Sequence, residues 1–150
     1  MNINFICLGF NELNLQQLYE LLTLRLAVFV VEQNCPYQDL DDKDQQSMHL
    51  LGYSKEGQLL AYARLLPKGA TYKDYPSIGR VVVSKKARSQ GLGQPLMLKA
   101  IEELQQHFGT DPIKISAQAH LQKFYQSLDF ETTGEGYLED GIPHIAMIKK

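Results

Sequence analysis

The 150-residue sequence contains no tryptophan, only two cysteines and no apolar run long enough to cross a lipid bilayer. Its first residues have neither a basic start nor a sustained apolar stretch, so they do not resemble a secretory signal. With 15 basic and 17 acidic side chains the formal net charge is −2, which excludes the broad basic surface that nucleic acids or anionic lipids require. We therefore predict a cytoplasmic protein that binds neither nucleic acid nor membrane.

The scarcity of cysteine also bears on metals and disulfides. Cys7 and Cys35 are too few for a disulfide scaffold, and a cytoplasmic setting would keep both reduced. They are not spaced as zinc ligands, and the four histidines show no i,i+4 pairing, so we expect no metal site. The hydrophobic fraction of 44% and the charged fraction of 21% are ordinary for a globular protein. A chain of this length fits one domain over residues 1–150.

Hydrophobic periodicity predicts a mixed α/β fold. Leucines recur at helical spacing after Asn14, a residue type that commonly caps helices. A β-branched run at 78–83 indicates a buried strand, and the helix and strand after it make a βαβ unit with parallel strands. We expect one mixed central sheet of six to seven strands flanked by three to four helices. The expected elements are helices at 14–29, 91–107 and 121–128, strands at 78–83, 113–117, 132–133 and 144–148, and an antiparallel hairpin of strands 48–53 and 59–66.

The most polar stretch, residues 38–47, carries four aspartates and is predicted to be a long solvated surface loop. It does not match a calcium-binding loop, because Lys43 stands at a ligand position and Asp44 at the required glycine. The alternative is that its carboxylates attract a cationic amine.

A glycine-containing segment between a buried strand and a helix is the most informative part of the chain. Residues 85–93 place three cations and two glycines there, in a protein that is otherwise slightly acidic. Glycines let a backbone approach a ligand closely, and a helix N-terminus presents free N–H groups and a positive dipole end. The segment suits a pyrophosphate. It is neither a Walker loop nor a dinucleotide fingerprint, and its alternative role is a tight turn.

Two patterns resemble the GNAT acetyltransferase superfamily. Arg88-x-x-Gly91-x-Gly93, directly after the strand at 78–83, is similar to its acyl-CoA signature Arg/Gln-x-x-Gly-x-Gly/Ala. Residues 118–130 are similar to a second pattern, Asn-x-x-Ala-x-x-Phe-Tyr-x-x-x-Gly-Phe, and residues 25–33 and 140–144 resemble the ElaA-like branch. The matching positions of the second pattern are Phe124, Tyr125 and Phe130, and the departures are Gln118, Leu121 and Asp129.

The resemblance implies an N-acetyltransferase that moves an acetyl group from acetyl-CoA to a primary amine in a ternary complex, with acyl-CoA bound where two parallel strands splay apart. It implies that the backbone N–H of Val83 polarises the thioester carbonyl and that Tyr125 gives a proton to the leaving thiolate. Packing in the core is the alternative role of Tyr125. The implied acyl-CoA-binding residues are Val81, Val82, Val83, Arg88, Ser89, Gln90, Gly91, Leu92, Gly93, Gln94, Gln118, Phe124 and Tyr125.

The acceptor side has several candidates. A base must take a proton from the amine, and Glu32, His49, His120, His144 or a water could serve, although each side chain also has a purely structural alternative. Arg80 is a candidate for orienting an acidic group of the acceptor, or else forms a structural ion pair. We expect the acceptor to be a small-molecule or protein amine. Whether the chain forms a homodimer is left open by the sequence. The alternative functions are a catalytically silent acyl-CoA sensor and, against the charge, an acetyltransferase of RNA-borne amines.

Overall fold

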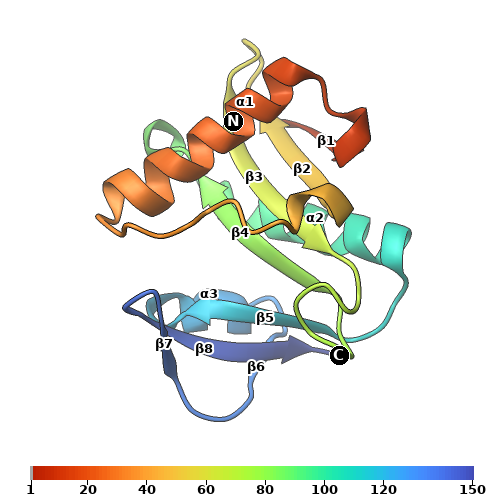
Figure 1. Cartoon of the computed structure of the whole chain (residues 1–150), viewed down its shortest axis with the longest axis vertical. Coiled ribbons are helices and arrows are strands. Elements are labelled where there is room, and N and C mark those ends of the chain that lie inside the picture. The colour runs from red at the N-terminus through yellow and green to blue at the C-terminus, as the bar shows by residue number, and fades with distance from the viewer. Residues whose placement is uncertain (1) are drawn as a thin grey trace.

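The computed structural model describes residues 2–150, and within them the backbone forms two four-stranded antiparallel sheets (Figure 1). The first sheet has the order β1-β2-β3-β4, whereas in the second β8 pairs with β5, β6 and β7. The strands are β1 (Asn4–Gly9), β2 (Met48–Tyr53), β3 (Leu59–Leu66), β4 (Ser77–Val83), β5 (Ile113–Gln118), β6 (Glu131–Thr132), β7 (Tyr137–Glu139) and β8 (Ile142–Lys149). The α-helices are α1 (Leu15–Leu26), α2 (Gly93–Phe108) and α3 (Gln122–Gln126).

The two sheets meet where β4 and β5 begin. The backbone N–H of Lys114, near the start of β5, donates to the carbonyl of Pro76, which immediately precedes β4, at 3.1 Å. From that point the two strands run in the same direction and diverge, with α2 as the crossover between them (Figure 1). The mixed α/β fold and the parallel, splayed strands are therefore as expected. The expectation of one continuous sheet is corrected, because β4 and β5 share no ladder within the described residues.

Helices cover both faces of the first sheet (Figure 1). The larger core lies between the inner face of α2 and the strands β2, β3 and β5, and the smaller core lies under α1 around Leu21 and Tyr62. β2 and β3 are buried along most of their length because both of their faces are covered. No helix within residues 2–150 is both long and apolar enough to span a membrane.

Most of the predicted elements are present, and some bounds shift. The hairpin strands at 48–53 and 59–66 have the predicted limits, and Asn14 caps α1 by accepting from the N–H of Gln17 at 2.7 Å. Beyond α1 the chain continues as a π-helix at Ala27–Glu32, so the helical segment extends past the predicted end. Sequence periodicity missed β1 and β7. β7 has only three residues, and all three are exposed, so it carries no hydrophobic pattern.

Candidate active site

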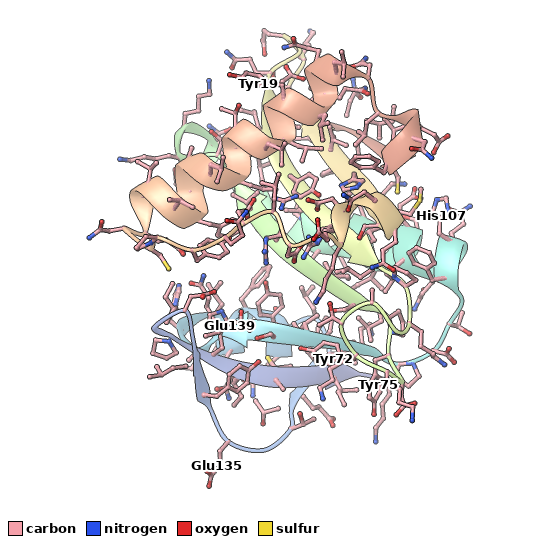
Figure 2. All side chains as sticks on the ribbon, in the orientation of Figure 1. Tyr19, Tyr72, Tyr75, His107, Glu135 and Glu139 are labelled. Carbon is pink, nitrogen blue, oxygen red and sulfur yellow. The ribbon has the colours of Figure 1, made fainter. Side chains whose placement is uncertain are left out.

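A cleft of about 730 Å³ occupies the space between the two diverging sheets. One wall is formed by β4 and the segment 28–43, and the other by β5, α3 and the β7–β8 hairpin. In Figure 2, side chains from both sheets project into this region, with Glu139 and Tyr72 on the side of the second sheet. The cleft is therefore a consequence of the splayed strands, and it brings together segments far apart in the chain.

A bulge in β4 exposes its backbone toward the cleft. Between the pairs Tyr62↔Val82 and Arg64↔Gly79, β4 contains one residue more than β3, and Arg80 at this point has a left-handed φ of 49°. The N–H of Ser84 donates to the carbonyl of Leu60 on β3 at 2.7 Å. Because backbone directions alternate along a strand, the N–H groups of residues 81 and 83 point away from β3, toward the cleft.

Arg80 is held in this conformation by a loop rather than facing the cleft freely. Its Nε donates to Oδ1 of Asp39 at 2.9 Å, and its Nη2 donates to the Asp39 carbonyl at 3.0 Å. A left-handed φ is costly for a residue with a side chain, so these bonds compensate local strain. The structural ion pair considered for Arg80 is thus present, although Arg80 also lines the cleft.

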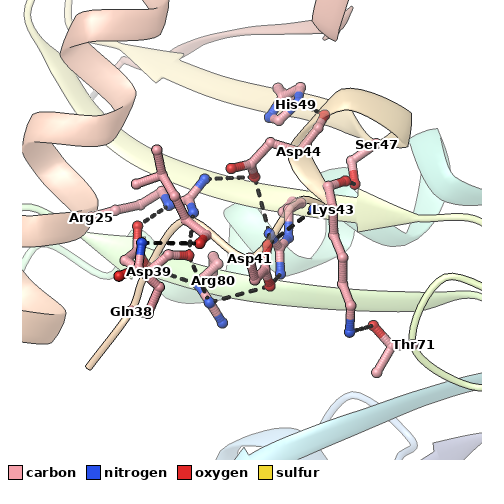
Figure 3. Close-up of polar contacts among 12 residues, drawn as sticks. Arg25, Gln38, Asp39, Asp41, Lys43, Asp44, Ser47, His49, Thr71 and Arg80 are labelled. Atoms are coloured by element: carbon pink, nitrogen blue, oxygen red, sulfur yellow. Dashed lines mark hydrogen bonds and ion pairs between the residues drawn. The ribbon is translucent and has the colours of Figure 1, made fainter.

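The predicted solvated loop at 38–47 is corrected, because Asp39, Asp41 and Asp44 pair with three arginines (Figure 3), and among its aspartates only Asp42 is exposed. Asp39 is 2% exposed and Asp44 is 7% exposed. The ion pairs close a ring in which each carboxylate bridges two guanidinium groups. The ring runs Arg25–Asp39–Arg80–Asp41–Arg64–Asp44 and returns to Arg25, with N···O distances of 2.8 to 3.4 Å.

The arginines keep these carboxylates ionised. Burial alone would raise the pKa of Asp41, but hydrogen bonds and charge from Arg64 lower it to about 2. The pKa of Asp44 is likewise lowered by Arg25 against the effect of burial. The arginines come from α1, β3 and β4, so the ring ties the loop to α1 and to two strands of the first sheet. It thereby fixes the part of the cleft wall that the loop provides.

His49 belongs to the same buried region and does not line the cleft. Its Nδ1 lies 2.6 Å from the Tyr62 hydroxyl, and its Nε2 lies 2.9 Å from the carbonyl of Asp44. Burial lowers its pKa, so the imidazole is neutral. Both ring nitrogens are occupied, which gives His49 a structural role.

The loop before α2 has the geometry expected for an anion site. Ser89 and Gly91 adopt left-handed φ values of 69° and 71°, and the residue preceding α2, Leu92, makes no side-chain cap. The first N–H groups of α2 are therefore left without a side-chain acceptor. A Cβ atom on Gly93 would lie 3.4 Å from the ring of Phe124, so glycine there allows close packing of α2 on α3.

Arg88 joins this loop to both the strand and the helical segment after α1. Its Nε donates to the carbonyl of Val83 at 3.3 Å, and its two terminal nitrogens pair with both carboxylate oxygens of Glu32. Hydrogen bonding to Arg88 lowers the pKa of Glu32. Glu32 is thus an ionised partner of Arg88, an arrangement that does not favour it as a base.

Tyr125 reaches the cleft from α3 while most of its surface is buried. The residue is 7% exposed, packs edge-on against Phe124 and Phe130, and lines the cleft. Burial alone raises its pKa to about 12, with no contribution from a hydrogen bond or a charge among the described residues. Tyr125 therefore combines the packing role with a hydroxyl that stays protonated at neutral pH. Asp129, which follows α3, has the left-handed φ of 71° that an aspartate tolerates better than most residues.

His144 on β8 belongs to the same wall of the cleft as Tyr125, in a cluster that the sequence analysis did not predict. Its Nδ1 lies 2.7 Å from the carbonyl of Ile142, so this nitrogen carries the proton in the neutral ring and Nε2 is the acceptor. Nε2 lies 3.5 Å from the carboxylate of Glu139, which in turn accepts from Ser116 at 3.3 Å. Tyr137 stacks on the imidazole with a centroid distance of 6.3 Å.

The structure brings together many, but not all, of the predicted site residues. Those that line the cleft are Glu32, Arg80, Val81, Val82, Val83, Arg88, Gln118, His120, Tyr125 and His144. Those that do not are His49, Ser89, Gln90, Gly91, Leu92, Gly93, Gln94 and Phe124. Residues 89–94 directly follow Arg88, which lines the cleft.

Comparisons with known proteins agree with the fold. Residues 14–150 match the model of the Acetyltransferase (GNAT) domain family. The chain is 50% identical over 142 residues to Protein ElaA of Escherichia coli, covering 93% of this chain and 92% of that protein. The crystal structure of Escherichia coli ElaA superposes with a TM-score of 0.91, at 46% identity, over 99% of this chain and 100% of that one. An acyl-CoA N-acyltransferase from Pseudomonas aeruginosa gives a TM-score of 0.93, at 44% identity, over 99% and 100% of the two chains.

Proposed function

The chain belongs to the GNAT acetyltransferase family and is ElaA-like, and from that premise we propose that it transfers an acetyl group from acetyl-CoA to a primary amine. One observation carries the proposal. The unpaired edge of β4 after Arg80, the hydroxyl-bearing Tyr125 and Arg88 line the same cleft, and the loop that follows Arg88 leads to the uncapped N-terminus of α2. These are the groups that an extended thioester with a pyrophosphate at one end requires.

The donor side is supported by backbone geometry. The N–H groups of Val81 and Val83 point away from β3, toward the cleft, where a pantetheine arm can pair with β4 as an added strand. The pyrophosphate would lie at the loop 88–93, on the free N–H groups at the start of α2. Arg88 stands between these two subsites and supplies a positive charge. Acetyl-CoA would bring the activated acyl group, and the residues of this chain would orient it.

The acyl transfer follows from the placement of three groups. The amine nitrogen forms a bond to the thioester carbon as the carbon–sulfur bond breaks, and the Val83 N–H stabilises the oxygen that gains negative charge. Tyr125 donates its proton to the departing sulfur, whose thiol has an ordinary pKa of about 8.5. We assign the base to His144, because its Nδ1 holds the ring proton against the Ile142 carbonyl and its Nε2 can accept the proton that the amine releases.

Glu139 has a supporting role in this scheme. Its carboxylate lies 3.5 Å from His144 Nε2, where it stabilises the imidazolium that forms when the amine loses its proton. As an exposed carboxylate on the rim, Glu139 also favours an acceptor that arrives as an ammonium cation. Small amines and peptide amines both satisfy this requirement.

The test measures CoA release with a thiol reagent across a panel of small primary amines and lysine-containing peptides, alongside calorimetric binding of acetyl-CoA. Tyr125→Phe should bind acetyl-CoA like the wild type and lose about 10²–10⁴-fold in kcat, the usual contribution of a general acid. Tyr19→Phe is the matched control, since Tyr19 is 73% exposed on α1 and lies away from the second sheet (Figure 2). Absence of acetyl-CoA binding by the folded protein would overturn the proposal. Saturable binding without turnover of any amine would instead favour the acyl-CoA sensor.

A further inference from the structure

A second cluster of reactive side chains lies outside the cleft, between the first strand and the second helix. Cys7 on β1, together with Glu103 and His107 on α2, places one sulfur, one oxygen and one nitrogen atom within 4.8 Å of one another. None of the three lines the cleft, and His107 lies at the edge of the molecule away from Glu139 (Figure 2). The acyl transfer therefore makes no use of this cluster.

The cluster arises from the regular geometry of the two elements. Glu103 and His107 are separated by one helical turn, so they share a face of α2, with His107 Nε2 lying 3.4 Å from Glu103 Oε2. Cys7 and Phe5 lie two residues apart on β1, so both side chains are on the face that packs against the core under α2. The thiol is thereby directed at the same helix face.

The distances suit a tetrahedral ion. Zinc binds imidazole nitrogen and carboxylate oxygen at about 2.0–2.1 Å, which places two such ligand atoms about 3.3 Å apart at the corners of a tetrahedron. The observed Glu103–His107 separation of 3.4 Å is already this edge length. The Cys7 sulfur lies within 4.8 Å of both atoms, so a bound ion would draw this sulfur closer to them.

We propose that Cys7, Glu103 and His107 form a binding site for Zn²⁺, with water from solvent as the fourth ligand. Thiolate, imidazole and carboxylate are the donors that zinc prefers, and the site draws them from two elements. The His107 side chain is 38% exposed and that of Glu103 is 15% exposed, so an ion can enter from solvent and retain a water. A bound ion would link the edge strand β1 to α2.

To bind, the ion must replace the proton of the Cys7 thiol and the ammonium group of Lys99 beside Glu103. Burial, together with the neighbouring carboxylate of Glu103, raises the pKa of Cys7 to about 12, so the ion must displace the thiol proton and releases it to solvent. Lys99 lies 3.4 Å from Glu103 and must give up this carboxylate, and the carboxylate of Glu12 also faces the thiol. Lys99 is therefore a competitor of the metal, which provides a variant expected to bind more tightly.

The experiment uses the purified full chain, stripped with a chelator, kept reduced with a phosphine and titrated with Co²⁺ as a spectroscopic substitute for Zn²⁺. We expect one ion per chain, a near-ultraviolet sulfur-to-cobalt charge-transfer band, and loss of the band when Zn²⁺ is added. Cys7→Ser should abolish the band, while Cys35→Ser, which removes the chain's other cysteine, should leave it unchanged. Circular dichroism establishes that each variant is folded.

Two further variants keep the proposal falsifiable if Cys7→Ser does not fold. His107→Ala alters a partly exposed side chain and should weaken Co²⁺ binding by at least about tenfold, since even losing an outer partner of a ligand costs about 10–100-fold. Lys99→Ala should strengthen binding. A wild-type titration without the sulfur band, or a band that survives Cys7→Ser or keeps its affinity in His107→Ala, would overturn the site.

Discussion

The substitution Asp39→Asn tests the buried ring of ion pairs at its most enclosed member. The Asp39 carboxylate accepts hydrogen bonds from Arg25 at 2.9 Å, from Arg80 at 2.9 Å and from the Tyr37 hydroxyl at 2.7 Å. Asparagine keeps the size of the side chain but removes the negative charge. Arg25 and Arg80 then lose a shared counter-ion, and around the fully buried Arg25 water cannot replace it.

The expected loss of stability follows from the burial of both partners of the Arg25–Asp39 ion pair. The side chains of Arg25 and Asp39 are both 0% exposed, and breaking a buried ion pair by removing one partner costs about 3–5 kcal/mol. For 150 residues the unfolding entropy near the midpoint is about 0.3 kcal/mol per kelvin. We therefore expect Tm to fall by about 10–16 °C.

The assay is thermal and urea unfolding followed by circular dichroism, with Asp42→Asn as the matched control. Asp42 belongs to the same loop, is exposed and has a left-handed φ of 63°, which asparagine adopts readily. The control should stay within about 0.5 kcal/mol of the wild type. A loss below about 1 kcal/mol for Asp39→Asn would refute the view that the ring carries the loop.

Three other outcomes follow from the structure. The pKa of Asp41 is about 2 in the folded protein against an ordinary 3.8, so its ion pairs stabilise the fold fully above about pH 4. In urea unfolding titrations, the free energy of unfolding should therefore fall by about 2 kcal/mol as the pH is lowered toward 2. Glu32→Gln should tighten acetyl-CoA binding in calorimetry, because it frees Arg88 from its carboxylate partner; unchanged or weaker binding would contradict a role of Arg88 in holding the donor. Gly93→Val should lower stability by about 1–3 kcal/mol in the same unfolding assay, because the added atoms press on Phe124, and a wild-type Tm would refute the close packing.

Local patterns in the sequence were sufficient for much of the fold. The helical spacing after Asn14 and the alternation of strand and helix from 78 to 118 depend on neighbours within a few residues, and each appears in the structure. The glycine-containing segment at 85–93 and the Phe124–Tyr125 pair indicated the GNAT family, which the family match confirmed. Both patterns are short and contiguous, so they can be read without knowing which segments meet.

The loop at 38–47 shows where this reading fails. A run of aspartates with one lysine has the composition of a solvated loop, and nothing nearby in the chain supplies its counter-charges. Arg25, Arg64 and Arg80 lie on three different elements and reach the loop only after the first sheet and α1 have packed together. Burial of charge depends on such distant partners, so composition alone could not predict it.

By itself, the sequence determined the α/β class, the order of the main elements and the family, because these depend on short-range periodicity and contiguous motifs. Only the tertiary structure decided the bulge at Arg80, the meeting of His144 with Glu139 at the cleft, and the approach of Cys7 to His107. Each of these depends on strand register or on contact between remote segments. Such contacts are set by how the faces of the sheets and helices pack, and adjacent residues carry no signal of them.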